Sequence, residues 1–344
     1  MQNHQIGSQE AGQRLDKFLH KYFPEAGTAF LYKMLRKKNI VLNKKKAEGK
    51  EILVEGDSLD FFFSEETFAK FRGMEKSGTT SRLLTAVYEK AYESLHGITV
   101  LYEDADMLAL DKPAGVLTQK AEDTDVSLNE WMIGYLLKKG RMTEEILKTF
   151  KPSVLNRLDR NTSGLVLCGI SLKGSQILSR MIHDRTVHKY YAAVVKGRVD
   201  KAGILGGVLE KDEIANKVTI KDVGEGKEVR TIYEPAAYAD GLTLLSIELV
   251  TGKTHQITGR THQIRAHMAG IGHPLLGDAK YGDRSFNEAY RKKGVKSQLL
   301  HAQRMVFPTL RELPEEEAKK AKDLAFLGKT IEAPLPEVFH RVGF

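Results

Sequence analysis

Apolar positions between residues 14 and 72 change from helical spacing to strand spacing within a short distance. In the run RLDKFLHKYF they recur at intervals of three and four, which places them on one face of a helix. These positions are Leu15, Phe18, Leu19, Tyr22 and Phe23. The pattern also predicts a second helix over 28–38 and strands over 40–43, 52–55 and 59–63. Residues 1–72 are therefore expected to form a small α+β domain.

The rest of the chain has longer apolar segments. Residues 73–95 open with the polar run GMEKSGTTS and are expected to be a linker, to which LLTAVYEKAYESL could add a short helix. Residues 96–344 are expected to form a second, larger domain. Its predicted helices cover 127–139 and 172–184, and its predicted strands lie within 98–116, 164–171, 188–199 and 242–250. Because helices and strands interleave without a regular repeat, an α+β domain with a mixed, largely antiparallel sheet is favoured.

The distribution of charge adds a candidate partner. The chain has 53 Lys and Arg against 45 Asp and Glu, and a net charge of +8 favours polyanions, although many mildly basic proteins bind no nucleic acid. Basic side chains cluster at the end of the second predicted helix and in the turn after it. They are Lys33, Arg36, Lys37, Lys38, Lys44, Lys45, Lys46 and Lys50. A solvated helix face is the alternative, but the one-sided clustering favours contact with RNA phosphates.

Several classes of protein receive no support from the sequence. Cys168 is the only cysteine, so an internal disulfide is excluded. No stretch approaches the ~20 apolar residues of a membrane span, and the first residues lack the apolar core of a signal peptide. We therefore expect a cytoplasmic protein without a membrane partner. Glycine fingerprints for ATP or NAD do not occur. The spacing of His255, His262, His267 and His273 fits no zinc pattern, so neither a metal nor a cofactor is expected.

The run NRLDRNTSGLVL, residues 156–167, is the strongest candidate for chemistry. It places Asp159 between Arg157 and Arg160 and ahead of an apolar strand. Nearby positive charge favours an ionised carboxylate that can act as a nucleophile. A turn in which Asp159 caps backbone amides explains the same residues. The residue types alone do not separate these two interpretations.

The same run resembles the signature of the RluA-type pseudouridine synthases, in which His-Arg-Leu-Asp precedes Thr-Ser-Gly. The resemblance implies that Asp159 is the nucleophile and that Arg157 helps to displace the target base. Asn156 stands where most members have His, which leaves the role of this position open. The runs LDKPAGVLT, HKYYAAVVKG and GRTHQIRAHMAGIGHPLLGDAKYG match further family motifs in the family's order. They imply that Tyr191 is the active-site tyrosine and that Arg265 pairs with the catalytic aspartate.

The small domain resembles the alpha-L RNA-binding module found in a ribosomal protein and in RNA-modifying enzymes. The matching features are RLDKFL, the two helices with Lys and Arg, VLNKKK and the closing EGDSLDF. Together the two resemblances imply the pseudouridine synthase fold behind an RNA-binding domain. They also imply that the substrate is structured RNA, most of all large-subunit (23S) ribosomal RNA. No sustained heptads indicate a coiled coil, so a monomer is expected.

Residues 251–264 contain a near-perfect tandem repeat, TGKTHQI followed by TGRTHQI, where the family pattern has one copy. Only the second copy leads into Arg265. Since seven residues are about two helical turns, a longer helix or a bulged loop could absorb the extra copy. We expect Arg265 to reach Asp159, with Lys253 of the first copy displaced.

Two other functions are compatible with parts of the sequence. The repeat is compatible with a non-catalytic RNA-binding or ribosome-assembly factor on the same scaffold. A nucleoside hydrolase or glycosidase needs paired carboxylates, and a single well-placed aspartate disfavours it.

Overall fold

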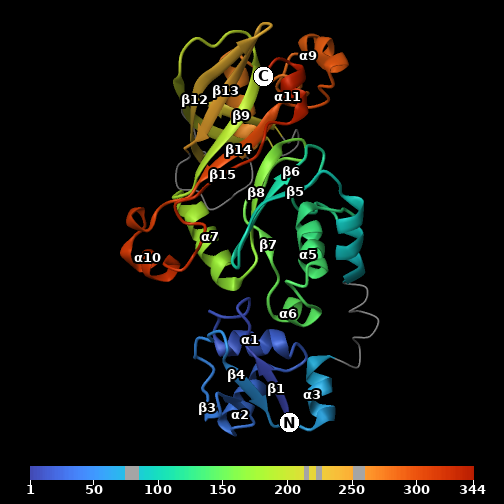
Figure 1. Cartoon of the computed structure of the whole chain (residues 1–344), viewed down its shortest axis with the longest axis vertical. Helices are drawn as coiled ribbons and strands as arrows, with labels where there is room; N and C mark the ends of the chain where they lie inside the picture. Colours follow the sequence, from blue (N-terminus) through green and yellow to red (C-terminus); the bar gives the residue numbers. More distant parts are fainter. Residues whose placement is uncertain (74–84, 213–216, 222–226, 251–259) are drawn as a thin grey trace.

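The computed structural model describes the chain except for residues 74–84, 213–216, 222–226 and 251–259. The N-terminal part forms a four-stranded antiparallel sheet with the strand order β1-β4-β2-β3 (Figure 1). Its elements are β1 (Gln2–Gln5), α1 (Leu15–Tyr22), α2 (Thr28–Arg36), β2 (Ile40–Leu42), β3 (Lys45–Lys46), β4 (Ser58–Phe61) and α3 (Glu65–Arg72). Both helices predicted before residue 40 are present.

This N-terminal unit has its own hydrophobic core. The apolar face of α1 is buried against the sheet and α3, with Leu15 and Phe18 fully inaccessible to solvent. The ring of Tyr22 stacks on that of Phe61 at 5.3 Å between centroids. Because aromatic side chains bury large apolar areas, such a cluster can stabilise a unit of this small size.

The strand predicted over 52–55 is wrong. Ile52 makes only an isolated bridge to Arg14, and its side chain is exposed. The amide of Val54 donates to the carboxylate of Asp57 at 2.8 Å, which draws the backbone into a turn instead. The strand β1 was not predicted, because its residues QNHQ carry no apolar alternation and pair with β4 through the backbone.

The larger part is organised around one extended sheet (Figure 1). Its main path runs β11-β10-β12-β13-β9-β14-β8-β6-β5, with β15 beside β14 and β7 beside β8. The strands are β5 (Thr99–Glu103), β6 (Met107–Lys112), β7 (Ser153–Val154), β8 (Ser163–Gly169), β9 (His188–Lys196), β10 (Gly203–Asp212), β11 (Lys217–Lys221), β12 (Lys227–Ala239), β13 (Leu242–Leu249), β14 (Leu300–Val306) and β15 (Thr330–Glu332). The helices are α5 (Leu128–Lys138), α6 (Glu144–Thr149), α7 (Leu172–Asp184), α8 (Arg260–Gly270), α9 (Arg284–Tyr290), α10 (Glu315–Ala321) and α11 (Glu337–Arg341).

The sheet is mixed and largely antiparallel, which confirms the predicted α+β class. The parallel pair joins β14 to β8, with His301 opposite Ser163. At the next position Gly164 packs so tightly that an added Cβ would lie 2.3 Å from the carbonyl oxygen of Ala302. Only glycine fits there, and its φ of +109° belongs to the region that glycine favours. This pairing brings the start of β14 next to the loop that precedes β8.

The two parts of the chain contact each other through α1 and α6, which face one another in Figure 1. The buried carboxylate of Glu10 accepts a hydrogen bond from the hydroxyl of Thr149. Arg72 forms an ion pair with Glu145. The interface therefore combines a buried polar contact with a peripheral charge pair.

Residues 85–94, inside the segment expected to be a linker, form the short helix that its sequence could add. Tyr88 packs in the core of the larger part, and the ring of Tyr92 lies 5.4 Å from that of Trp131. Within the described residues, no helix combines the length and the apolar character that crossing a membrane requires.

Candidate active site

The loop before β8 carries Asp159, and a buried asparagine fixes its start. The side chain of Asn156 donates to the carbonyl of Leu165 at 3.1 Å and accepts from the amide of Leu167 at 2.7 Å. Both partners lie on β8, so one side chain ties the loop to the strand that follows it. The role that the sequence left open at position 156 is therefore structural.

Two further side chains hold the middle of this loop. The hydroxyl of Thr118 donates to the carbonyl of Leu158 at 2.8 Å. Lys112, which is fully buried, donates from Nζ to three backbone carbonyls. Those carbonyls belong to Pro113, Val116 and Arg160. Burial lowers the pKa of Lys112 to about 7, although Asp159 and Asp111 act in the opposite direction.

Asp159, Arg265 and Asp278 form a line of alternating charges. Arg265 Nη1 donates to Asp159 Oδ2 at 3.3 Å. Its Nε and Nη2 donate to the two carboxylate oxygens of Asp278 at 2.7 and 2.8 Å. The side chain of Asp278 is fully buried, whereas that of Asp159 is 26% exposed. The outer carboxylate is therefore accessible to a ligand, and the inner one anchors the arginine.

The electrostatics of the buried pair support this assignment. Although burial alone would raise the pKa of Asp278, its hydrogen bonds with Arg265 hold that pKa below the ordinary value. Burial would also lower the pKa of Arg265, but Asp278 and then Asp159 raise it above the ordinary value. Bidentate, charge-assisted hydrogen bonds of this kind fix both the position and the direction of a guanidinium group.

His262 lies beside the same carboxylate and contacts Tyr281. His262 Nε2 lies 3.7 Å from Asp159 Oδ2, and its Nδ1 lies 3.0 Å from the hydroxyl of Tyr281. Burial lowers the pKa of His262, and Asp159 opposes that shift. The guanidinium carbon of Arg265 lies 5.1 Å from the centre of the Tyr281 ring. An imidazole and a guanidinium thus lie next to Asp159, and the phenol of Tyr281 lies against both of them.

A cavity of about 210 Å³ opens beside Asp159. Its lining comes from the loop before β8, from α8, from the loop after α8 and from the segment before β14. The lining residues are Asp159, Arg160, Asn161, His262, Arg265, Gly277, Ala279, Lys280, Lys296, Ser297 and Gln298. Polar and charged groups dominate this set, as a polar ligand requires.

The expected contact between Arg265 and Asp159 is present. Lys253 and the rest of the first repeat copy lie outside the described residues, and α8 begins at Arg260. Tyr191 is not one of the described residues that line this cavity. It is 3% exposed on β9 and shares the core cluster of Ile264 and Met268 from α8. Arg157 is exposed.

The predicted RNA-binding side chains lie away from this cavity, on the N-terminal unit. They occupy the end of α2, the turn after it and the β2–β3 hairpin (Figure 1). All are exposed: Lys33, Arg36, Lys37, Lys38, Lys44, Lys45 and Lys46. Lys38 and Lys44 have positive φ angles of 59° and 61°, so the backbone turns sharply at both positions.

The histidines considered as metal ligands have separate partners. His262 contacts Tyr281, His267 contacts Thr231 at 2.8 Å, and His273 contacts a backbone carbonyl. His255 lies outside the described residues. In the part of the chain that is described, no group of three or more His, Cys, Asp or Glu side chains is placed to hold a metal ion.

Sequence reasoning missed Asp278, His262 and Lys112 as parts of the site. Asp278 lies in GDAKYG, the end of the motif run 259–282, and Lys112 lies in LDKPAG. A signal was available in both cases, because a charged residue among apolar neighbours is costly to bury unless it is paired. The sequence did not show, however, which groups would pair with Asp278 and with Lys112; the fold was needed for that.

Comparison with known proteins gives the class of this molecule. Residues 106–258 match a family model described as RNA pseudouridylate synthase. The ribosomal large subunit pseudouridine synthase C of Rickettsia bellii is 30% identical over 334 residues, which cover 96% of each chain. Its counterpart in Vibrio cholerae is 29% identical over 304 residues, covering 88% of this chain and 87% of the relative.

Among solved structures, human RNA Pseudouridylate Synthase Domain Containing 4 has the same fold. The TM-score is 0.51 at 18% identity, over 78% of this chain and 97% of the human one. Fold and relatives together define an enzyme that makes pseudouridine in RNA. The chain belongs to the RluA-type family of RNA pseudouridine synthases, and within it resembles ribosomal large subunit pseudouridine synthase C.

Proposed function

We propose that this enzyme isomerises specific uridines of large-subunit ribosomal RNA, with Asp159 as its nucleophile. The RNA target is inferred from the names of the relatives in R. bellii and V. cholerae. The nucleophile is inferred from the family motif and from one geometric observation. Arg265, which Asp278 holds in place, donates a hydrogen bond to the partly exposed carboxylate of Asp159, and this carboxylate lines a cavity.

The reaction detaches the base from the ribose, rotates it and rejoins it through carbon 5. The target uridine must first leave the RNA helix, which costs a few kcal/mol of unstacking. Asp159 then assists cleavage of the glycosidic bond, by direct attack or by promoting a glycal. The new carbon–carbon bond forms as the proton on carbon 5 departs to solvent. Arg265 acts as a positioning residue, because its hydrogen bond directs the carboxylate.

We assign two further roles by the family motif. Arg157 is exposed on the loop that carries Asp159, where it could enter the RNA helix as the base leaves. Tyr191 stacks on the base or transfers a proton. Tyr191 lies in the core that α8 also joins. During RNA binding, either the flipped base must reach Tyr191 or α8 must shift.

We further propose that residues 1–72 bind RNA, that residues 73–95 connect the two parts and that residues 96–344 form the catalytic domain. The exposed basic cluster of α2 and the β2–β3 hairpin supports RNA binding, since phosphate contacts dominate affinity for nucleic acids. The separate hydrophobic core of the N-terminal unit supports the division.

The decisive experiment compares the unmodified enzyme with Asp159→Asn on ribosomal RNA labelled with tritium at carbon 5 of uridine. We expect tritium release by the unmodified enzyme, and a loss of at least about 10⁴-fold in the variant because the carboxylate that assists bond cleavage is removed. RNA binding should change little. Asp123→Asn, an exposed carboxylate outside the cavity, is the matched control.

Retained turnover by Asp159→Asn contradicts the assigned nucleophile. RNA binding without turnover by the unmodified enzyme contradicts the proposed activity. Mapping the pseudouridines that form in bulk ribosomal RNA then identifies the modified sites.

A further inference from the structure

A second cavity adjoins the one beside Asp159. Its volume is about 540 Å³, within the range of cavities that hold small ligands. The two cavities share one wall, which consists of Asn161, Lys296, Ser297 and Gln298. A nucleotide bound beside Asp159 therefore has space for a chain neighbour directly across this wall.

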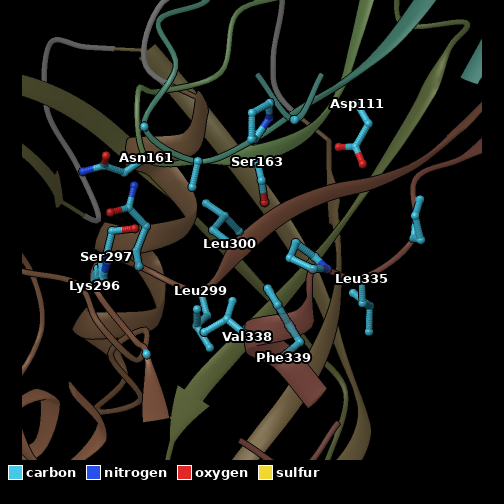
Figure 2. Close-up of a pocket in the computed structure, with 18 residues that line it drawn as sticks. Asp111, Asn161, Ser163, Lys296, Ser297, Leu299, Leu300, Leu335, Val338 and Phe339 are labelled. Atoms are coloured by element: carbon cyan, nitrogen blue, oxygen red, sulfur yellow. The ribbon is translucent and has the colours of Figure 1, made fainter. Parts of the chain in front are cut away.

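The larger cavity has apolar sides that suit a flat ring. Pro113 contributes from the loop after β6, and Leu335 and Pro336 contribute from the segment before α11. Val338 contributes from α11 itself, and Figure 2 shows it near Leu335. These side chains are only partly buried, so they can still contact a ligand. Unpaired RNA bases are commonly bound by stacking on such surfaces.

Asp111 provides the specific polar group of this cavity. Figure 2 shows its carboxylate directed toward the space between Ser163 and Leu335. Ser163 is already engaged with His301 at 2.9 Å, and the amide of Gln298 donates to Thr162 at 3.4 Å. Among the described residues, none donates a hydrogen bond to the carboxylate of Asp111.

A carboxylate without a protein donor in a partly buried site gains hydrogen bonds from a ligand that supplies donors. Burial raises the pKa of Asp111 to about 6, against the opposing charge of Lys112. The group is therefore mainly ionised above pH 7. Its unpaired charge lowers the stability of the free protein, and a ligand with N–H groups would offset that loss.

Guanine is the base whose donors match a carboxylate. Its Watson–Crick edge presents N1–H and N2–H₂ side by side, one for each carboxylate oxygen. Adenine and cytosine each offer one amino group there, and uracil offers one imide N–H. Because two parallel hydrogen bonds to a charged acceptor are stronger and more selective than one, the site should prefer guanine.

We propose that this cavity binds a guanine next to the target uridine in the RNA strand, held at its Watson–Crick edge by Asp111. Lys296, exposed on the shared wall, would contact the phosphate that joins the two nucleotides. This inference rests on the proposed function, because it takes the smaller cavity as the uridine site. It adds a determinant of sequence specificity that is separate from the catalytic group.

The test uses two RNAs that contain a mapped target and differ at its neighbouring guanine. One carries guanine and the other inosine, which lacks the N2 amino group. For the unmodified enzyme we expect inosine to lower kcat/KM by about tenfold or more, the effect of losing one hydrogen bond to a charged group. Asp111→Asn should lose activity on the guanine RNA and show the same kcat/KM for both RNAs.

Asp200→Asn, an exposed carboxylate that pairs with Arg198 after the end of β9, is the matched control and should discriminate like the unmodified enzyme. Ala114→Trp provides an independent variant, since Ala114 is exposed at the cavity rim and a large ring there obstructs entry without disturbing the core. It should also remove the preference for guanine.

Binding measurements separate this inference from the proposed function. Asp159→Asn should bind the guanine RNA more tightly than the inosine RNA, and this preference needs no turnover. Equal binding and equal kcat/KM for the two RNAs overturn the guanine site while leaving the catalytic assignment intact. Mapped targets that have no adjacent guanine overturn it as well.

Discussion

Arg265 is anchored by Asp278 rather than by Asp159. Its two hydrogen bonds to Asp278 measure 2.7 and 2.8 Å, whereas the one to Asp159 measures 3.3 Å. The buried carboxylate of Asp278 therefore sets the position of the Arg265 guanidinium. The guanidinium in turn directs the partly exposed carboxylate of Asp159. A longer outer bond leaves Asp159 room to move during the reaction.

Asp278→Asn should lower kcat by about 10- to 100-fold. Asn keeps one acceptor but loses the bidentate bond, so Arg265 can rotate away from Asp159. RNA affinity should stay within about threefold, since Asp278 is inaccessible to the ligand. Single-turnover kinetics and a filter-binding assay check the two values. Asp283→Asn breaks a surface pair with Lys196 and serves as the control. An unchanged kcat in Asp278→Asn contradicts this arrangement.

Two basic residues, Lys253 inside the tandem repeat and Arg265 directly after it, could contact the carboxylate of Asp159. We predict that Arg265→Lys lowers kcat by about 100-fold, because Lys cannot bridge two carboxylates in a bidentate manner. Lys253→Ala should retain kcat within about twofold. Tritium release under saturating RNA measures both. The reverse ranking of the two variants would mean that the first repeat copy supplies the active-site cation.

Asn156→Ala should destabilise the protein by about 1–3 kcal/mol. The change leaves a buried amide and a buried carbonyl of β8 without partners. Urea unfolding monitored by circular dichroism gives the free energy of unfolding. We also expect a lower kcat, since the loop carrying Asp159 loses its tie to the strand. Asn39→Ala, at a partly buried site in the N-terminal unit, is the comparison. Equal stability of Asn156→Ala and the unmodified protein would refute a structural role for Asn156.

Asp111→Asn should raise the melting temperature at pH 7.5 and change it little at pH 4. The folded pKa of Asp111, about 6, lies above its ordinary value, so folding favours the protonated carboxylate. The resulting penalty is absent below pH 4, grows between pH 4 and 6 and is complete above that range. Thermal unfolding across this range tests the sign. A melting temperature that falls at pH 7.5 would show that the charge is stabilising instead.

Replacing Lys44, Lys45 and Lys46 by Gln should weaken binding to all RNAs by a similar factor. If each lysine contacts one phosphate, the slope of log K against log salt should become shallower by about 2–3. Titrations at several salt concentrations provide this slope. The triple replacement of Lys319, Lys320 and Lys322 removes the same charge from the α10 region and should leave the slope unchanged. An identical slope in both variants contradicts RNA contact through the β2–β3 hairpin.

The sequence by itself determined most of the helices and, through its family motifs, the class of reaction. The apolar spacing of α1, α5 and α7 sufficed because each helix buries one continuous face. The run NRLDRNTSG was enough to single out Asp159 as the predicted nucleophile, because the residues of the family motif are consecutive. Strands such as β1 escaped prediction, since their stability comes from backbone pairing with distant partners rather than from their own side chains.

The tertiary structure alone decided which charges meet. Arg265 and Asp159 are far apart in the chain, and Asp278 joins them only because α8 and the loop after it fold back over the sheet. The parallel pairing of β14 with β8 likewise places Lys296 and Gln298 against the loop of Asp159, creating the wall between two cavities. Such contacts depend on strand register and crossover, which are global properties of packing that no local pattern of residues specifies.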